Sequence, residues 1–140
     1  MVDANLIFWP VIVQAFVTLA LYVVMSRARI ASIKQGRAKA SDFRLPNRDE
    51  GDETRAIANA VTNQFELPVL FFAVCLAAHA AGTVNALLIA LAWCFVITKT
   101  AHSYVHATSN KLRHRRPIFI AAFFTVTLMW VWFAIGIMVM

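Results

Sequence analysis

Residues 6–25 read LIFWPVIVQAFVTLALYVVM, a run without a single charged side chain. A transmembrane helix needs about 20 predominantly apolar residues to cross the hydrocarbon core of a bilayer. The run therefore predicts a membrane-spanning helix near the start of the chain. The composition agrees, because 61% of the 140 residues are hydrophobic, only 14% are charged, and the mean hydropathy is +0.68. A soluble domain of this length would need a more polar surface.

Three further apolar segments follow. Residues 118–140 are uncharged and long enough to span a bilayer alone, whereas residues 67–81 and 84–97 are shorter. The two short segments reach spanning length only with the polar residues 54–66 and 98–110. We therefore expect an all-α integral membrane four-helix bundle. The expected spans in the single domain, residues 1–140, are about 6–26, 54–81, 84–110 and 117–140, with a loop over 27–53.

The basic residues are confined to two connections between these spans. Eight Lys and Arg fall in residues 27–55 and the other five in residues 99–116, which accounts for all thirteen. With four spans, both connections lie on one side of the membrane, and the positive-inside rule makes that side cytoplasmic. Both termini are then expected on the opposite side. The net charge of +6 thus indicates topology, and we expect no nucleic-acid partner.

Two of the expected helices carry polar stripes at their basic ends. Each helical residue advances about 100°, so side chains three or four residues apart share a face. The stripes consist of Arg55, Asn59, Asn63 and Glu66 in the second span, and of Lys99, His102, Ser103, His106, Asn110 and Arg113 in the third. Because polar groups facing lipid are costly, the stripes should face each other or a water-filled cleft.

The stripes have two interpretations. Polar side chains across a helix interface can act as structural glue, worth about 1–2 kcal/mol or less. Alternatively, ionisable residues inside a membrane mark a functional site. Glu66 needs a cation in either case, and Arg55 is the expected intrachain partner, with a ligand or another subunit as alternatives.

Two smaller features bear on the site. Pro68 lacks the amide that would bond the carbonyl of Gln64, so it should kink the second span or loosen a turn there; the alternative is a proline that the membrane helix tolerates. His102 and His106 are spaced to share a metal ion, but no third ligand is evident, so we expect hydrogen bonding in a cleft and no metal site.

These motifs resemble the MAPEG family, the membrane-associated proteins in eicosanoid and glutathione metabolism, and in particular its bacterial branch. In the second span the resemblance rests on Asn63-x-x-Glu66 followed by Pro68, with Arg55 two turns upstream. In the third it rests on Lys99-x-x-His102-Ser103-x-x-His106 and the sequence NKLRHRRP at residues 110–117. The resemblance covers nearly the whole chain, and Asn-x-x-Glu is its most specific part.

The resemblance implies a bundle that assembles as a homotrimer in a bacterial inner membrane, with both termini periplasmic. It implies glutathione as cofactor, bound between subunits in a cleft open to the cytoplasm. The activity implied is glutathione-dependent transfer to, or peroxidase action on, lipophilic electrophiles that enter from membrane lipid. The alternatives are a non-catalytic lipid-binding or accessory membrane protein of the same fold, and a purely structural bundle, so whether the chain is an enzyme stays open.

The resemblance also implies site residues. Those implied to hold glutathione are Arg55, Asn59, Asn63, Glu66, Lys99, His102 and His106. An Arg near the start of the last helix is implied to activate the thiol, and the candidates are Arg113, Arg115 and Arg116. The chain departs from the pattern of glutathione-binding members at Asn59, where they carry Arg, and at His106, where no Tyr is present.

Overall fold

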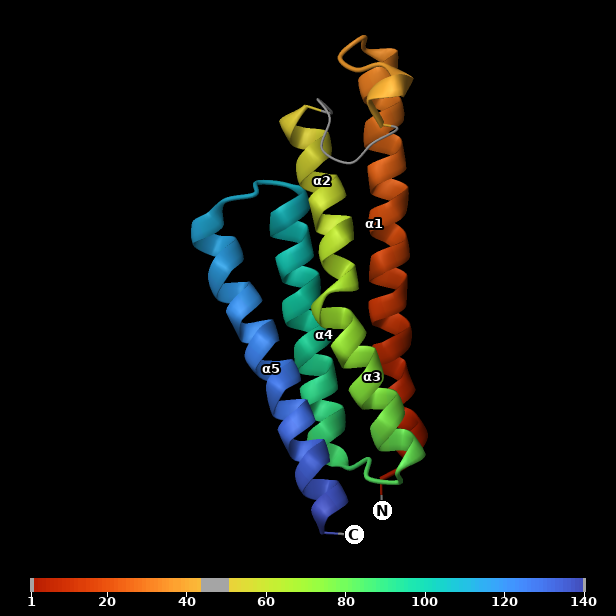
Figure 1. Ribbon diagram of the computed structural model, residues 1–140, viewed down its shortest axis with the longest axis vertical. Coiled ribbons are helices and arrows are strands. Elements are labelled where there is room, and N and C mark those ends of the chain that lie inside the picture. The colour runs from red at the N-terminus through yellow and green to blue at the C-terminus, as the bar shows by residue number, and fades with distance from the viewer. Residues whose placement is uncertain (1, 44–50, 140) are drawn as a thin grey trace.

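The computed structural model describes residues 2–43 and 51–139, so Arg44 and Arg48 of the expected loop lie outside the described residues. The described residues contain helices and no strand, which confirms the all-α prediction. Figure 1 shows these helices as an elongated bundle. The α-helices are α1 (Phe8–Lys34), α2 (Asp52–Thr62), α3 (Leu67–Ala80), α4 (Ala86–Ala107) and α5 (Leu112–Met138), and the 3-10 helices are η1 (Ala4–Ile7), η2 (Ala40–Phe43) and η3 (Asn63–Phe65).

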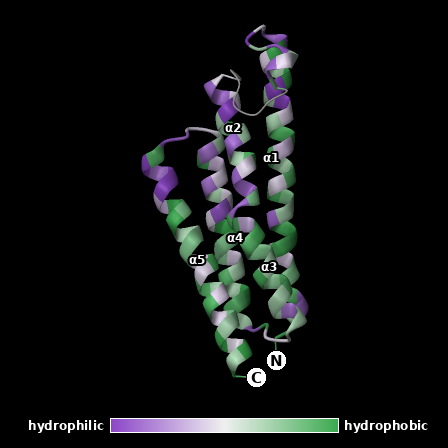
Figure 2. Cartoon of the chain, in the orientation of Figure 1, coloured by the Kyte–Doolittle hydropathy of each residue, from purple (hydrophilic) through white to green (hydrophobic). Residues whose placement is uncertain are grey.

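Within the described residues, four helical stretches are long and apolar enough to cross a membrane. They are Ala4–Lys34, Asp52–Ala80, Ala86–Ala107 and Leu112–Met138, the second being α2, η3 and α3 together. Both termini lie at one end of the bundle, and the α1–α2 and α4–α5 connections lie at the other (Figure 1). Figure 2 shows hydrophilic residues gathered toward these connections. We call this end the basic end.

Helix α1 extends past residue 26, where the expected loop begins, and continues to Lys34. The added residues, RARIASIK, are compatible with a helix because they include Ala, Arg and Lys and no Gly or Pro. Gly36 then ends the helix with a φ of 67°. The amide of Arg37 bonds back to the carbonyl of Ser32 at 3.0 Å, which is the closing bond of a Schellman motif.

The second span is interrupted at the stretch around Glu66. Helix α2 ends at Thr62, η3 covers Asn63–Phe65, and α3 begins at Leu67. Glu66 itself has φ −101° and ψ −103°, outside the helical region. Pro68 sits in the first turn of α3, where a missing amide costs nothing. The prediction that Pro68 kinks this span or loosens a turn is confirmed, because the regular helix is interrupted just before Pro68.

The apolar core lies on the terminal side of this interruption. Phe71 of α3 and Phe95 of α4 stack with ring centroids 4.5 Å apart and planes inclined by 11°. Val74, Leu88 and Met129 are buried in the same cluster. Helix α4 packs against α1, α2 and α5, so it is the central helix of the bundle. The side chains near its C-terminal end therefore lie among three neighbours.

Candidate functional site

A cavity of about 240 Å³ lies at the basic end. Its lining comes from η3, from the last turns of α4 and from the first turns of α5. The lining residues are Asn63, His102, His106, Leu112, Arg115, Arg116 and Phe119. Five of these seven were predicted as site residues, and the structure brings them together from three elements. Leu112 and Phe119, which were not predicted, give the cavity an apolar side.

Lys99 holds Asn63 in position. It is fully buried, and its Nζ donates to the backbone carbonyl of Asn63 at 3.0 Å and to Oδ1 of the same residue at 2.5 Å. Nδ2 of Asn63 donates in turn to Oε2 of Glu66 at 2.5 Å. The carboxamide therefore links a buried ammonium to a carboxylate, which offsets part of the cost of the two charges at this depth. The lining of the cavity includes Asn63 but does not include Lys99.

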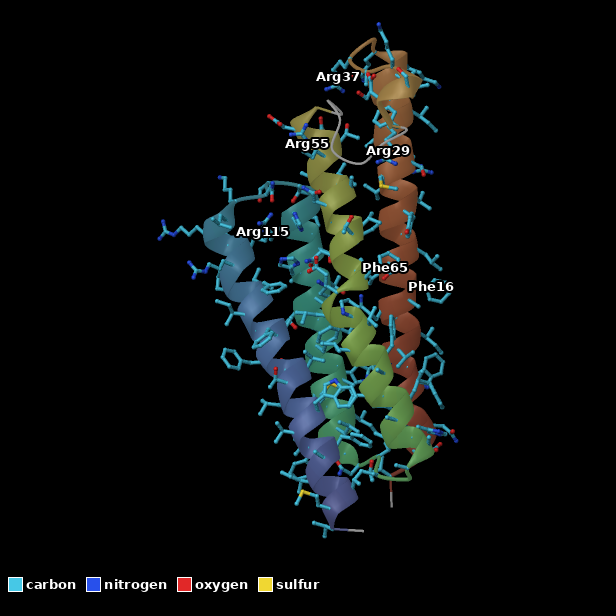
Figure 3. The ribbon with its side chains drawn as sticks, in the orientation of Figure 1. Phe16, Arg29, Arg37, Arg55, Phe65 and Arg115 are labelled. Atoms are coloured by element: carbon cyan, nitrogen blue, oxygen red, sulfur yellow. The ribbon has the colours of Figure 1, made fainter. Side chains whose placement is uncertain are left out.

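Glu66 does not pair with Arg55 in the protomer, so that prediction is wrong. The two residues would share a face of a regular helix, but they are eleven positions apart, which is about 16 Å along the axis. Figure 3 shows Arg55 close to the tip of α2, well away from η3. A shared face brings side chains together only when they are three or four residues apart.

The polar stripe of the second span is divided in the structure. Asn63 points into the protomer, whereas Asn59 and Glu66 are exposed and Arg55 is half-buried. None of these last three lines the cavity. For Glu66 the cause is the interruption at η3, because 3-10 turns and the unusual Glu66 backbone change the phase that a regular helix would keep.

The stripe of the third span, in contrast, is directed inward. Lys99, His102, Ser103 and His106 are all buried within the protomer. The rings of His102 and His106 meet edge to face with centroids 5.5 Å apart, and the ring of Phe119 lies 5.5 Å from that of His102. Among residues 2–43 and 51–139, no group of three or more metal-ligating side chains is close enough to hold a metal ion.

Arg115 is positioned by the turn between α4 and α5. Asn110 has a φ of 48° there, and its amide bonds to the carbonyl of Val105 at 2.8 Å. Its Oδ1 accepts a hydrogen bond of 2.6 Å from Nη1 of Arg115. Figure 3 shows Arg115 between the start of α5 and the end of α4. Of the three candidate arginines, Arg115 and Arg116 line the cavity, and Arg113 is exposed outside it.

A buried hydrogen-bond chain beside the site was not predicted from sequence. Nε2 of Gln14 on α1 donates to Oε1 of Gln64 at 3.0 Å, and Nε2 of Gln64 donates to Oγ of Ser103 on α4 at 2.7 Å. Gln14 is fully buried. One sequence feature could have indicated this chain, because Gln14 is the only carboxamide in the apolar run 6–25. The first span is therefore part of the polar layer next to Asn63.

These features define a class of protein: an integral membrane four-helix bundle with a cavity of mixed polarity at its basic end. A sequence profile of the MAPEG family matches residues 7–135, nearly the whole chain. The chain belongs to the MAPEG family, which includes glutathione transferases and peroxidases as well as non-catalytic members. No curated protein and no solved structure gives a significant match.

Proposed function

We propose that the protein is a membrane-bound, glutathione-dependent transferase or peroxidase that acts on lipophilic electrophiles. The observation that carries the proposal is the composition of the cavity. It combines two arginines, two histidines and an asparagine carboxamide with the apolar side chains of Leu112 and Phe119. The frequent use of glutathione in the MAPEG family supports the same conclusion.

The arginines fit the activation of a thiol. The nucleophile in such reactions is the thiolate, and nearby cations and helix N-termini favour it over the thiol. Arg115 and Arg116 stand in the first turns of α5, close to the positive end of its dipole. Asn110 holds the guanidinium of Arg115, so Arg115 is the better placed of the two to stabilise a thiolate.

The remaining residues fit the two partners of the reaction. Asn63 presents a carboxamide whose orientation is fixed by Lys99, and Glu66 offers a carboxylate for the ammonium group of glutathione. Leu112 and Phe119 provide a surface for an electrophile arriving from lipid. We also propose that the basic end is cytoplasmic, in a bacterial inner membrane, where it would meet cytosolic glutathione.

Spectroscopy of the purified protein tests the proposal. When glutathione is added to the protein in mild detergent, the ultraviolet absorbance should increase because the bound thiol ionises to the thiolate. Arg115→Met keeps much of the side-chain volume and removes the guanidinium, so it should abolish this signal. Arg113→Met is the matched control, because Arg113 is exposed outside the cavity, and it should leave the signal intact.

Absence of any thiolate signal in the wild type, together with absence of glutathione binding by calorimetry, would contradict the proposal. That result would favour the alternative of a non-catalytic lipid-binding or accessory protein with the same bundle. Equal losses in Arg113→Met and Arg115→Met would instead contradict the specific role of Arg115.

A further inference from the structure

The last turns of α1 continue past the apolar run and form one edge of the basic end. The apolar run stops at Met25, whereas α1 continues to Lys34. In Figure 1 this part of the helix extends beyond the α4–α5 connection. The guanidinium of Arg29 lies 5.2 Å from the centre of the Phe43 ring of η2. Together with the Schellman bond of Arg37, that contact stabilises the end of α1 as a regular helix.

One face of this segment combines two cations with an isoleucine. Arg27, Ile30 and Lys34 are three and four residues apart, so they share a face of the helix. All three are exposed, and the exposed fraction of Ile30 is 53%. The opposite face of α1 is buried against the rest of the protomer, as at Leu21 and Ser32. The cationic face therefore points away from the bundle.

The protein does not neutralise these two cations in the part of the chain that the structure describes. No carboxylate there forms an ion pair with Arg27 or Lys34. The nearby carboxylates have other partners, because Glu53 lies 3.7 Å from Nη1 of Arg37 and Asp42 accepts a backbone amide at 2.8 Å. Both charges are thus available to an anion from outside the protomer.

An apolar stripe continues from the cations along the same face of α1. Its first members are Val23, Leu19 and Phe16, each more than half exposed. Figure 3 shows Phe16 pointing away from the bundle. From Arg27 to Phe16 the helix rises about 16 Å, which is about half the roughly 30 Å thickness of the hydrocarbon core. The stripe therefore extends through one leaflet of the bilayer, the depth that the acyl chains of a phospholipid occupy.

We propose that an anionic phospholipid binds along this face of α1. Its phosphate lies beside Ile30, between the two cations, and its acyl chains cover the stripe. A lysine at position 34 leans toward the N-terminus of its helix, and an arginine near the end of a span extends its guanidinium to the interface. Both cations can therefore reach one phosphate. The site lies outside the cavity, so its occupation does not depend on glutathione.

The chemistry of the face favours an anionic lipid over hydration and over a zwitterionic lipid. Hydration would leave the apolar side chain of Ile30 in water, whereas a phospholipid covers it. A headgroup of net negative charge is attracted by both cations. In a zwitterionic headgroup, the ammonium group offsets that attraction.

Native mass spectrometry of the purified protein in mild detergent tests the proposal. The probes are phosphatidylglycerol and phosphatidylcholine with the same acyl chains, and the quantity measured is the Kd of the first lipid bound per protomer. We expect phosphatidylglycerol to bind at least about tenfold more tightly. Arg27→Gln combined with Lys34→Gln should raise the Kd of phosphatidylglycerol about thirtyfold, because each cation near a membrane surface contributes about fivefold.

Lys39→Gln combined with Arg113→Gln is the matched control. It also removes one lysine and one arginine from exposed positions at the basic end, and it should keep the wild-type affinity. Ile30→Glu keeps both cations but places a carboxylate between them, so it should weaken phosphatidylglycerol binding as well. This variant serves if the loss of two charges from α1 prevents folding.

Four results would overturn the proposal. The first is equal affinity for the two lipids, or binding of neither. The second is an equal loss of affinity in the two double variants, which would mean that net charge attracts the lipid without a site. The third is unchanged affinity in the variants of Arg27, Lys34 and Ile30. The fourth is dissociation of lipid-free assemblies by these variants, which would mean that a second copy of the chain covers the face.

Discussion

At the scale of single residues, Glu66 shows how a carboxylate is tolerated within a membrane span. It is the middle residue of the stretch Asp52–Ala80, it is exposed on the protomer, and it accepts a hydrogen bond from Asn63. The amide oxygen of Gln can accept the same bond, so Glu66→Gln should fold and keep its thermal stability. The substitution removes the negative charge that we propose to pair with the ammonium group of glutathione. We expect the binding free energy of glutathione to weaken by about 1.5–3 kcal/mol, which raises its Kd roughly ten- to a hundredfold.

Calorimetry and thermal unfolding of one Glu66→Gln preparation separate the two interpretations of the polar stripe. Weaker glutathione binding at unchanged stability supports a ligand-binding role. Unchanged affinity with a clear loss of stability would mean that Glu66 serves as structural glue.

Asn110 combines two roles that substitution can separate. Its φ of 48° favours Asn or Gly, and its side chain holds Arg115. Asn110→Gly keeps the turn and releases Arg115, so it should lower thiolate formation without a large change in stability. Asn110→Ala releases Arg115 as well but strains the turn, at a cost of about 1–2 kcal/mol. Full thiolate absorbance in Asn110→Gly would show that this hydrogen bond does not position the arginine.

At the scale of helices, hydropathy and proline chemistry were sufficient to predict much of the fold. Apolar length located the membrane-crossing helices because lipid demands that each span satisfy its own backbone. Pro68 located the interruption of the second span because it removes a helical hydrogen bond. The orientation of Glu66 could not be predicted, since the stripe assumed a regular helix through η3. Phe119 was missed because an aromatic residue in an apolar span has no distinguishing pattern.

The Gln14–Gln64–Ser103 chain joins α1, η3 and α4. Removing one of its hydrogen bonds should destabilise the fold beside the cavity. Gln14→Leu leaves Oε1 of Gln64 without its donor, which should cost about 1–3 kcal/mol of unfolding free energy. A double-mutant cycle with Gln64→Leu should give a coupling of about 0.6–1.7 kcal/mol, as for other intramembrane hydrogen bonds. Thr18→Val is the control, because the Thr18 hydroxyl bonds within α1 to the carbonyl of Gln14. A coupling near zero would show that the chain does not link the helices energetically.

At the scale of the whole molecule, the arrangement of the termini makes the orientation testable. Both ends of the chain lie opposite the basic end (Figure 1). Lys39 is exposed at the basic end, so a cysteine introduced there should react with a membrane-impermeant reagent only after the cells are opened. A cysteine added at either terminus should react in intact cells, once the outer membrane is permeabilised. Reaction of position 39 from outside intact cells would reverse the orientation and contradict access to cytosolic glutathione.

Two properties of the protomer argue that it assembles, and we expect a homotrimer, as is frequent in the MAPEG family. Glu66 is exposed beside Phe65, Val69 and Leu70, a face that lipid would cover in a monomer. A charge at that depth costs about 2.5–3.5 kcal/mol on insertion scales. The cavity of about 240 Å³ is also smaller than the roughly 300–1,000 Å³ of typical ligand sites. A second copy packed on this face would remove the first cost and enlarge the site.

Native mass spectrometry in mild detergent should therefore show three chains. Val69→Trp adds bulk on the face around Glu66 and should shift the protein toward monomers. Leu128→Trp makes a comparable change at an exposed position of α5, outside the face around Glu66, and should leave the assembly intact. Dissociation should be accompanied by loss of glutathione binding, because the ligand would contact residues of two protomers. A dominant monomer that still binds glutathione would refute the shared site, and the charge of Glu66 would then have to be balanced within a single chain through Asn63 and Lys99 alone.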